Sequence, residues 1–129
     1  MNIFIVNQNP ESRYNDKDGE RYDYPRSIPN GKQINIGDVL IFNLSSKFSK
    51  KLLQGDKRIT GIAKIEGITQ YIHKGKTMAI ATYYWYKKID PFVSFDDIGV
   101  DPRSNMNNSI NKVKKEKHLE LILSLIQYL

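Results

Sequence analysis

Short apolar runs separated by turn residues constrain the fold of this chain more than any other feature. Each run has the length of a strand and is bounded by glycine, proline or amide residues. No long helical pattern lies between one run and the next, so no helical crossover joins parallel neighbours and we expect a mostly antiparallel sheet. The predicted strands are Asn2–Val6, Val39–Leu44, Arg58–Ile68 and Thr77–Ile89.

A single helical pattern ends the chain. Four apolar side chains recur there at helical spacing and predict a helix over about 112–129. They are Leu119, Ile122, Leu123 and Ile126. Asp90-Pro91 is predicted to end the last long strand, and a further extended segment begins at Pro91. The length fits a single domain over residues 1–129. We therefore expect an α+β fold: a curved antiparallel sheet or small open β-barrel with a C-terminal helix.

A long polar segment separates the first two predicted strands. Residues 11–35 are rich in turn residues and are predicted to form a loop, which in a compact domain is usually functional or disordered. Tyr22 and Tyr24 lie in this loop, one residue apart and next to Pro25. Their rings can pack against the neighbouring strand or hold a flat ligand such as a base, and the sequence leaves both interpretations open.

Positive charge is concentrated in the middle of the chain. The formal net charge is +6, yet residues 47–88 alone carry ten lysines or arginines against Asp56 and Glu66. A basic centre of this kind favours a polyanion partner, most often nucleic acid. A solvated lysine-rich face explains the same pattern equally well.

Side chains suited to catalysis are few and poorly placed. The chain has no cysteine, which excludes disulfides and thiolate chemistry. His73 lies in a basic turn and His118 in a lysine-rich helix start, and neither has an evident nucleophile to activate. Asp96, Asp97 and Asp101 are typical of a turn or helix cap. We therefore expect no enzyme activity, no metal and no cofactor.

Four aromatic rings follow one another at Tyr83–Tyr86. Strand alternation predicts Tyr83 and Trp85 on one face and Tyr84 and Tyr86 on the other. One face should belong to the core, and the other is a candidate stacking surface for bases. Trp85, the only tryptophan, is the preferred candidate.

Amide and hydroxyl side chains follow the first two strands. Asn7, Gln8 and Asn9 come where the first strand ends, and Ser45 and Ser46 follow the second. Amide groups can bond the edge of a base, although they are also ordinary turn formers.

Several of these segments together resemble the PUA-like superfamily. The resemblance covers nearly the whole chain and is strongest to the EVE-like modules of modification-dependent restriction endonucleases. The matching segments are Asn7-Gln8-Asn9-Pro10, Tyr22-Asp23-Tyr24-Pro25, Gly37–Phe42, Gly61–Ile65, Pro91–Phe95 and Asn108-Ser109-Ile110 with the final helix.

The resemblance implies a non-catalytic reader of modified double-stranded DNA. Relatives hold a modified base in an aromatic pocket, so the expected ligand is 5-methyl- or 5-hydroxymethylcytosine, reached by base flipping. Carried over by position, the base-pocket candidates are Asn7, Gln8, Asn9, Tyr22, Tyr24, Ser45, Ser46 and Trp85. The phosphate-binding candidates are Lys47, Lys50, Lys51, Lys57, Arg58, Lys74 and Lys76.

The resemblance also predicts the kind of larger protein to which the chain belongs. Members linked to endonucleases carry a separate nuclease or NTPase domain, so we expect residues 1–129 to be a fragment of a longer restriction protein. The sequence has neither a membrane-length apolar run nor a signal-type start, which favours an intracellular location. The resemblance to restriction systems implies that this location is the cytoplasm of a prokaryotic cell. Two alternatives stay open: an RNA-binding PUA-like module, and a protein-interaction domain that docks through its C-terminal helix.

Overall fold

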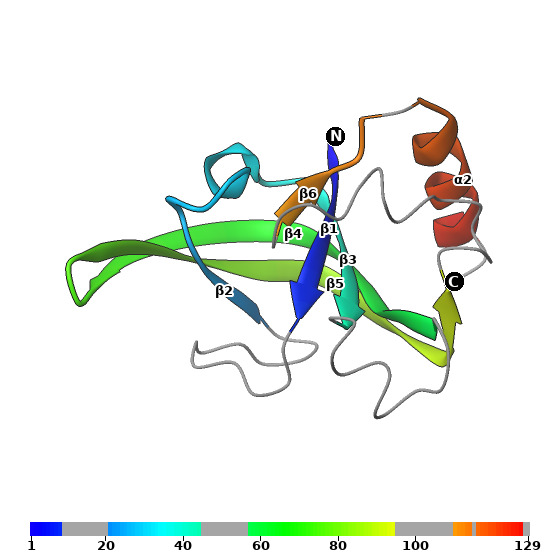
Figure 1. Cartoon of the computed structure of the whole chain (residues 1–129), viewed down its shortest axis with the longest axis horizontal. Helices are drawn as coiled ribbons and strands as arrows, with labels where there is room; N and C mark the ends of the chain where they lie inside the picture. The colour runs from blue at the N-terminus through cyan, green and yellow to red at the C-terminus, as the bar shows by residue number, and fades with distance from the viewer. Residues whose placement is uncertain (9–20, 45–56, 95–109, 115, 128–129) are drawn as a thin grey trace.

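A computed structural model describes five parts of the chain: residues 1–8, 21–44, 57–94, 110–114 and 116–127. These parts form strands, one short 3-10 turn and one helix (Figure 1). The elements are β1 (Ile3–Gln8), β2 (Arg21–Pro25), η1 (Gly31–Gln33), β3 (Val39–Leu44), β4 (Lys57–His73), β5 (Lys76–Ser94), β6 (Ile110–Lys112) and α2 (Glu116–Gln127).

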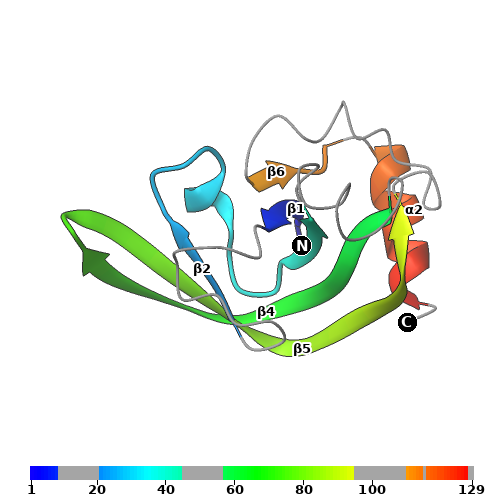
Figure 2. The ribbon, with the colours of Figure 1, turned by 60° about the horizontal axis from the view of Figure 1, so that its bottom comes forward.

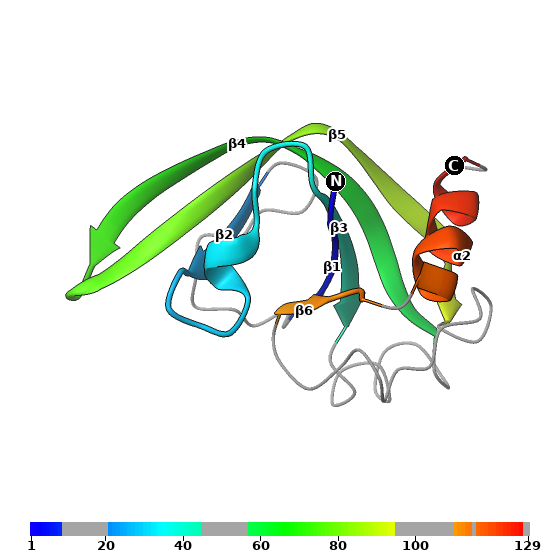
Figure 3. The same cartoon turned by 90° about the horizontal axis from the view of Figure 1, so that it is seen from above.

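The described strands form one curled sheet in the order β2-β5-β4-β3-β1-β6. Only β1 and β3 run parallel, and the other neighbouring pairs are antiparallel. Strands β4 and β5 bend along their length and give the sheet the shape of an open half-barrel (Figure 2). Figure 3 shows the arch of β4 and β5, with α2 at one end and the hairpin turn at the other. The predicted curved, mostly antiparallel sheet with a C-terminal helix is confirmed.

Both faces of the central sheet are buried. Along β1, Ile3 and Ile5 belong to one core cluster, whereas Phe4 and Val6 belong to another, as strand alternation requires. The first cluster, here called the helix-side core, includes Ile122 of α2. The second, here called the aromatic core, contains Tyr22, Tyr24, Leu40, Phe42 and Ile65, with Tyr83 and Tyr86 packed against it. Burying each large side chain contributes about 1.5–3 kcal/mol, so both clusters stabilise the curled sheet.

The loop predicted over residues 11–35 is wrong for Arg21–Pro25, which form strand β2, whereas residues 26–35 consist of turns and the short η1. Tyr22 and Tyr24 lie in this strand. In register they pair with Ala81 and Ala79 of β5, whose small side chains leave room for the large rings. Both rings are buried and stack with centroids 5.1 Å apart. The strand is a short edge strand with charged neighbours, and its stability comes from partners distant in sequence.

The break predicted at Asp90-Pro91 is also wrong, since β5 continues to Ser94. The register explains how a proline fits. Ile59 pairs with Val93 and Gly61 pairs with Lys88. An advance of two residues along β4 therefore corresponds to five residues along β5, so β5 bulges between these pairs. Pro91 falls in this irregular stretch, where a missing backbone N–H breaks no regular ladder.

The C-terminal helix begins later than predicted, at Glu116 rather than near residue 112. Residues Ile110–Lys112 instead form β6, which pairs with the open edge of β1. The backbone N–H of Val113 continues this contact by donating to the Ile3 carbonyl at 2.9 Å. Lys112, predicted at the start of the helix, therefore belongs to the strand that covers the exposed edge of β1.

Candidate functional site

The tip of the β4–β5 hairpin is a tight basic turn, as predicted. His73 pairs with Lys76 across the hairpin, and Lys74 and Gly75 connect them. Both connecting residues have positive φ angles, 50° at Lys74 and 77° at Gly75. Two successive positive φ values match the mirror-image turns that favour hairpins, which explains the glycine. The turn presents Lys74 and Lys76 to solvent at the end of a long arm.

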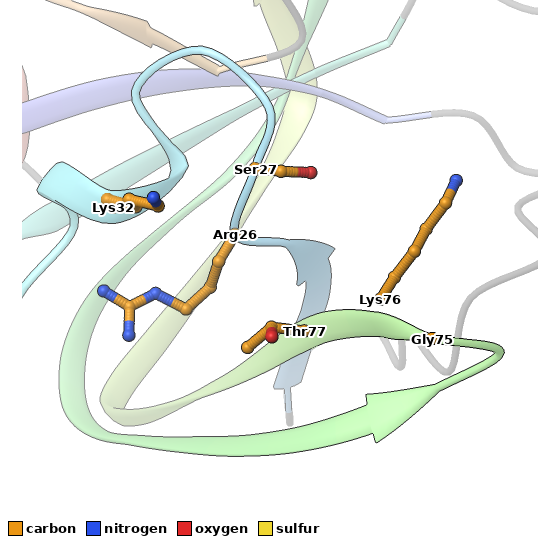
Figure 4. Close-up of a pocket in the computed structure, with 6 residues that line it drawn as sticks. All are labelled: Arg26, Ser27, Lys32, Gly75, Lys76 and Thr77. Atoms are coloured by element: carbon orange, nitrogen blue, oxygen red, sulfur yellow. The ribbon is translucent and has the colours of Figure 1, made fainter.

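A cavity of about 550 Å³ lies between this tip and the segment that follows β2. Its lining residues are Arg26, Ser27, Lys32, Gly75, Lys76 and Thr77. In Figure 4, Arg26 and Lys32 lie on one side of the view and Lys76 on the other, with Thr77 between them. The Arg26 backbone N–H donates to the Thr77 carbonyl at 3.0 Å and holds the two segments together. We call this cavity the cationic notch.

The segment from Arg26 to Lys32 is folded back on itself by two special positions. Asn30 has a φ of 68°, and its side-chain amide donates to the Ile110 carbonyl of β6 at 2.8 Å. The next position requires glycine, because a Cβ on Gly31 would lie 2.8 Å from the Arg26 carbonyl oxygen. This close approach brings Lys32 to the same cavity as Arg26.

The notch has the electrostatics of an anion site. All three cations, Arg26, Lys32 and Lys76, line the cavity, and none has a carboxylate partner within the described ranges. The hydroxyls of Ser27 and Thr77 add neutral donors to the lining. The lining thus offers a guanidinium, two ammonium groups and two hydroxyls as donors to the oxygens of a phosphate.

Arg26 also acts on the core. Burial raises the pKa of Tyr24 to about 12, and the positive charge of Arg26 works in the opposite direction and lowers it. Burial prevails because the phenolate would have to exist in an apolar environment, with a side chain that is 1% exposed. Tyr24 is therefore a neutral phenol beside the cations of the notch.

The proposed base-pocket residues do not come together in the described part of the chain. Tyr22 and Tyr24 belong to the aromatic core, whereas Trp85 packs against the helix-side core on the opposite face of the sheet. Asn7 lies at the end of β1, and its Oδ1 accepts a hydrogen bond from Asn43 at 2.8 Å. Asn43 is fully buried, and the sequence interpretation missed it. Asn9, Ser45, Ser46 and the side chain of Gln8 lie outside the described residues.

The alternation predicted for the aromatic row is wrong. Tyr83 and Tyr86 stack on the same face, with ring centroids 6.1 Å apart, while Tyr84 is 60% exposed. The cause is a register shift: Lys64 pairs with Trp85, but Ile65 pairs with Tyr83. Tyr84 is the extra residue, and it reverses the alternation beyond it. A bulge of this kind depends on strand pairing and cannot be read from the row itself.

Of the predicted phosphate contacts, Lys76 lines the notch and Lys74 lies in the adjoining hairpin turn. Lys47, Lys50, Lys51 and the side chains of Lys57 and Arg58 lie outside the described residues. Sequence interpretation missed Arg26 and Lys32, because both precede the basic window. Their signal was local: each directly follows a turn residue, Pro25 or Gly31, of a kind that places its neighbours at the surface.

The described part of the chain contains neither a candidate metal site nor a candidate membrane-spanning helix. Within the described ranges, His, Asp and Glu side chains form no group of three that could hold a metal ion. Asp96, Asp97 and Asp101 lie outside those ranges. The described part of the chain also contains no helix with the length and apolar character needed to cross a membrane.

Comparison with known proteins does not identify a family for this chain. No protein-family model matches this sequence, and a comparison with curated proteins finds no match. A function for the chain therefore has to be inferred from its own residues.

Proposed function

We propose that this chain is a nucleic-acid-binding domain that contacts the phosphate backbone through the cationic notch. The observation that carries the proposal is that Arg26, Lys32 and Lys76, from two segments distant in sequence, line one cavity and have no carboxylate partner among the described residues. Cations gathered along one cavity repel one another, so this arrangement gains little in the free protein. An anionic ligand bound in the cavity would offset that repulsion.

The shape of the arm suits a polymer better than a small isolated anion. The notch lies beside a hairpin turn whose exposed residues His73, Lys74 and Lys76 extend the basic surface away from the sheet. Phosphates of a nucleic acid recur at short intervals, so one can occupy the notch while its neighbours contact the turn. Phosphate contacts of this kind fix position and carry no base specificity.

Reading of modified cytosine is a finer proposal within the same function. It is supported by the resemblance, which implies a pocket that includes Asn7. This residue is half-buried near the end of β1, and an amide can contact the edge of a base. The test is binding of matched duplexes that carry cytosine, 5-methylcytosine or 5-hydroxymethylcytosine at fixed salt. Equal affinity for all three contradicts the finer proposal and leaves the phosphate-binding proposal intact.

The phosphate-binding proposal is tested by charge reversal at exposed positions. The variant Lys32→Glu/Lys76→Glu should bind a labelled duplex much more weakly, because two cations of the notch become anions. The slope of log affinity against log salt should also fall by about 0.9 for each phosphate that the variant no longer neutralises. Fluorescence anisotropy across a salt series measures both quantities.

The matched control is Lys88→Glu/Lys114→Glu, which changes the net charge equally at two exposed residues outside the notch. Its affinity should fall less, and its salt slope should stay near that of the unmodified protein. Equal losses of affinity in the two double variants would mean that net charge alone drives binding and that the notch has no special role.

A further inference from the structure

A second cavity of about 350 Å³ adjoins the cationic notch, and Arg26 lines both. Its lining differs in character from that of the notch. Three isoleucines and the ring of Tyr24 supply apolar surface, and two amides supply polar groups. The isoleucines are Ile34, Ile36 and Ile68, and the amides are Asn35 and Gln70. Both cavities have the size of sites that hold small molecules or parts of larger ones, about 300–1,000 Å³.

The apolar wall is unusually exposed for side chains of its type. Ile36 is 62% exposed although it borders the cavity, so a flat apolar group placed there would remove its surface from water. The backbone around it is fixed, because the Asn35 N–H donates to the buried Asp38 carboxylate at 2.8 Å. The hydrogen bond between Asn35 and Asp38 thus holds Ile36, which lies between them, at the cavity.

The polar groups of the cavity suit the edge of a base. Among the described residues, the exposed Gln70 amide has no hydrogen-bond partner, so it is available to a ligand. An amide offers a donor and an acceptor side by side, which matches the paired groups on a base edge. The shared Arg26 can stack on a planar ring or fork to a phosphate.

We propose that the two cavities together bind one unpaired nucleotide of a single-stranded nucleic acid, with its phosphate in the notch and its base against Ile36 and Gln70. This inference rests on the proposed function and specifies its ligand. The base must be unpaired because a base inside a duplex is stacked on both sides, and extracting it costs a few kcal/mol. Single strands present bases without that cost.

The experiment compares three labelled DNA 10-mers: oligothymidine, an abasic oligomer with the same backbone and the same charge, and a fully paired duplex, which carries about twice that charge. Oligothymidine should bind about tenfold more tightly than the abasic oligomer, which is in the range measured for a stacked base. It should also bind more tightly than the duplex. Ile36→Ser/Gln70→Ala should abolish the preference for bases and leave the abasic affinity unchanged.

Two further variants separate the possible outcomes. Ile72→Ser alters another exposed isoleucine, 78% exposed and outside the cavity lining, and should keep the preference. Lys32→Glu/Lys76→Glu should weaken oligothymidine and the abasic oligomer alike. Equal binding of oligothymidine and the abasic oligomer, or tighter binding of the duplex, overturns the inference. In that case, weaker DNA binding by Lys32→Glu/Lys76→Glu still supports the proposed function. No binding of any DNA overturns both.

Discussion

At the scale of single residues, Tyr24 belongs both to the aromatic core and to the lining of the second cavity. Its ring stacks on Tyr22 and is almost fully buried, yet it lines the same second cavity as Arg26. The raised pKa of Tyr24 shows that burial outweighs the stabilising charge of Arg26 on the phenolate. A hydroxyl in this position has consequences for stability that appear only at high pH.

The first prediction concerns alkaline unfolding. The pKa of Tyr24 is about 12 in the folded protein, against about 10 when unfolded, so only the unfolded chain ionises between these values. The contribution of Tyr24 is therefore constant below about pH 10 and is lost as pH rises toward 12, by about 2–3 kcal/mol in total. Urea unfolding from about pH 8.5 to about pH 11.5 measures this loss of stability.

The variant Tyr24→Phe cannot ionise and should lose less stability over that pH range than the unmodified protein. Tyr84→Phe, at a ring that is 60% exposed, is the matched control and should follow the unmodified protein. Identical pH dependence in Tyr24→Phe and the unmodified protein would contradict the assignment. Lysine ionisation affects all three proteins alike and cancels in the comparison.

At the scale of elements, the packing of the aromatic core against β4 depends on Gly61, which lies beneath the ring of Tyr86. A Cβ on Gly61 would lie 2.7 Å from Cζ of Tyr86, closer than real Cβ contacts allow. That ring also packs against Phe42 and stacks on Tyr83, so it has little freedom to move. The absence of a side chain at Gly61 therefore lets the aromatic core close over β4.

Gly61→Ala should accordingly destabilise the fold by about 1–3 kcal/mol, the usual cost of overpacking. Gly67→Ala is the control in the same strand, because its Cβ would meet only Thr82 Oγ1 at 3.2 Å. Thermal and urea unfolding should separate the two variants clearly. A Gly61→Ala protein as stable as Gly67→Ala would show that the Tyr86 ring shifts at no cost.

The elements also show what the sequence can predict. Strands β3, β4 and β5 were predictable in their apolar parts, whose burial is encoded locally, whereas the mostly exposed end of β4 after Ile68 was not. Strands β2 and β6 were not, because each is a short edge strand completed by a partner far along the chain. For the same reason the bulge at Tyr84 escaped prediction, and with it the faces on which Tyr86 and Trp85 lie.

At the scale of the whole molecule, the notch joins parts of the chain that are far apart in sequence. Arg26 and Lys32 come from the segment after β2, and Lys76 comes from the hairpin tip, with β3 and β4 between them along the chain. The sequence indicated a basic surface, but it could not show which cations converge, since the pairing of β2 with β5 decides that. Predicting Lys74 and Lys76 as phosphate contacts required only the turn, whereas finding their partners required the fold.

The last prediction tests whether the far edge of the sheet positions the notch. The Asn30 amide donates to the Ile110 carbonyl across 80 residues of sequence, and Asn30 has a φ of 68° that few side chains tolerate. Asn30→Gly removes the hydrogen bond and keeps the conformation, so it should lower stability by about 1 kcal/mol. Asn30→Ala also introduces backbone strain and should lower stability by about 1–2 kcal/mol more.

Neither Asn30 variant changes the charge, so any loss of oligonucleotide affinity at fixed salt must come from displacement of Lys32 and Arg26. We expect the affinity to fall in the order unmodified protein, Asn30→Gly, Asn30→Ala, while the salt slope stays nearly constant because the same phosphates are contacted. Urea unfolding and anisotropy on the same samples provide both readouts. Stability that falls without any change in affinity would mean that the notch is positioned by the Arg26–Thr77 contact alone and owes nothing to β6.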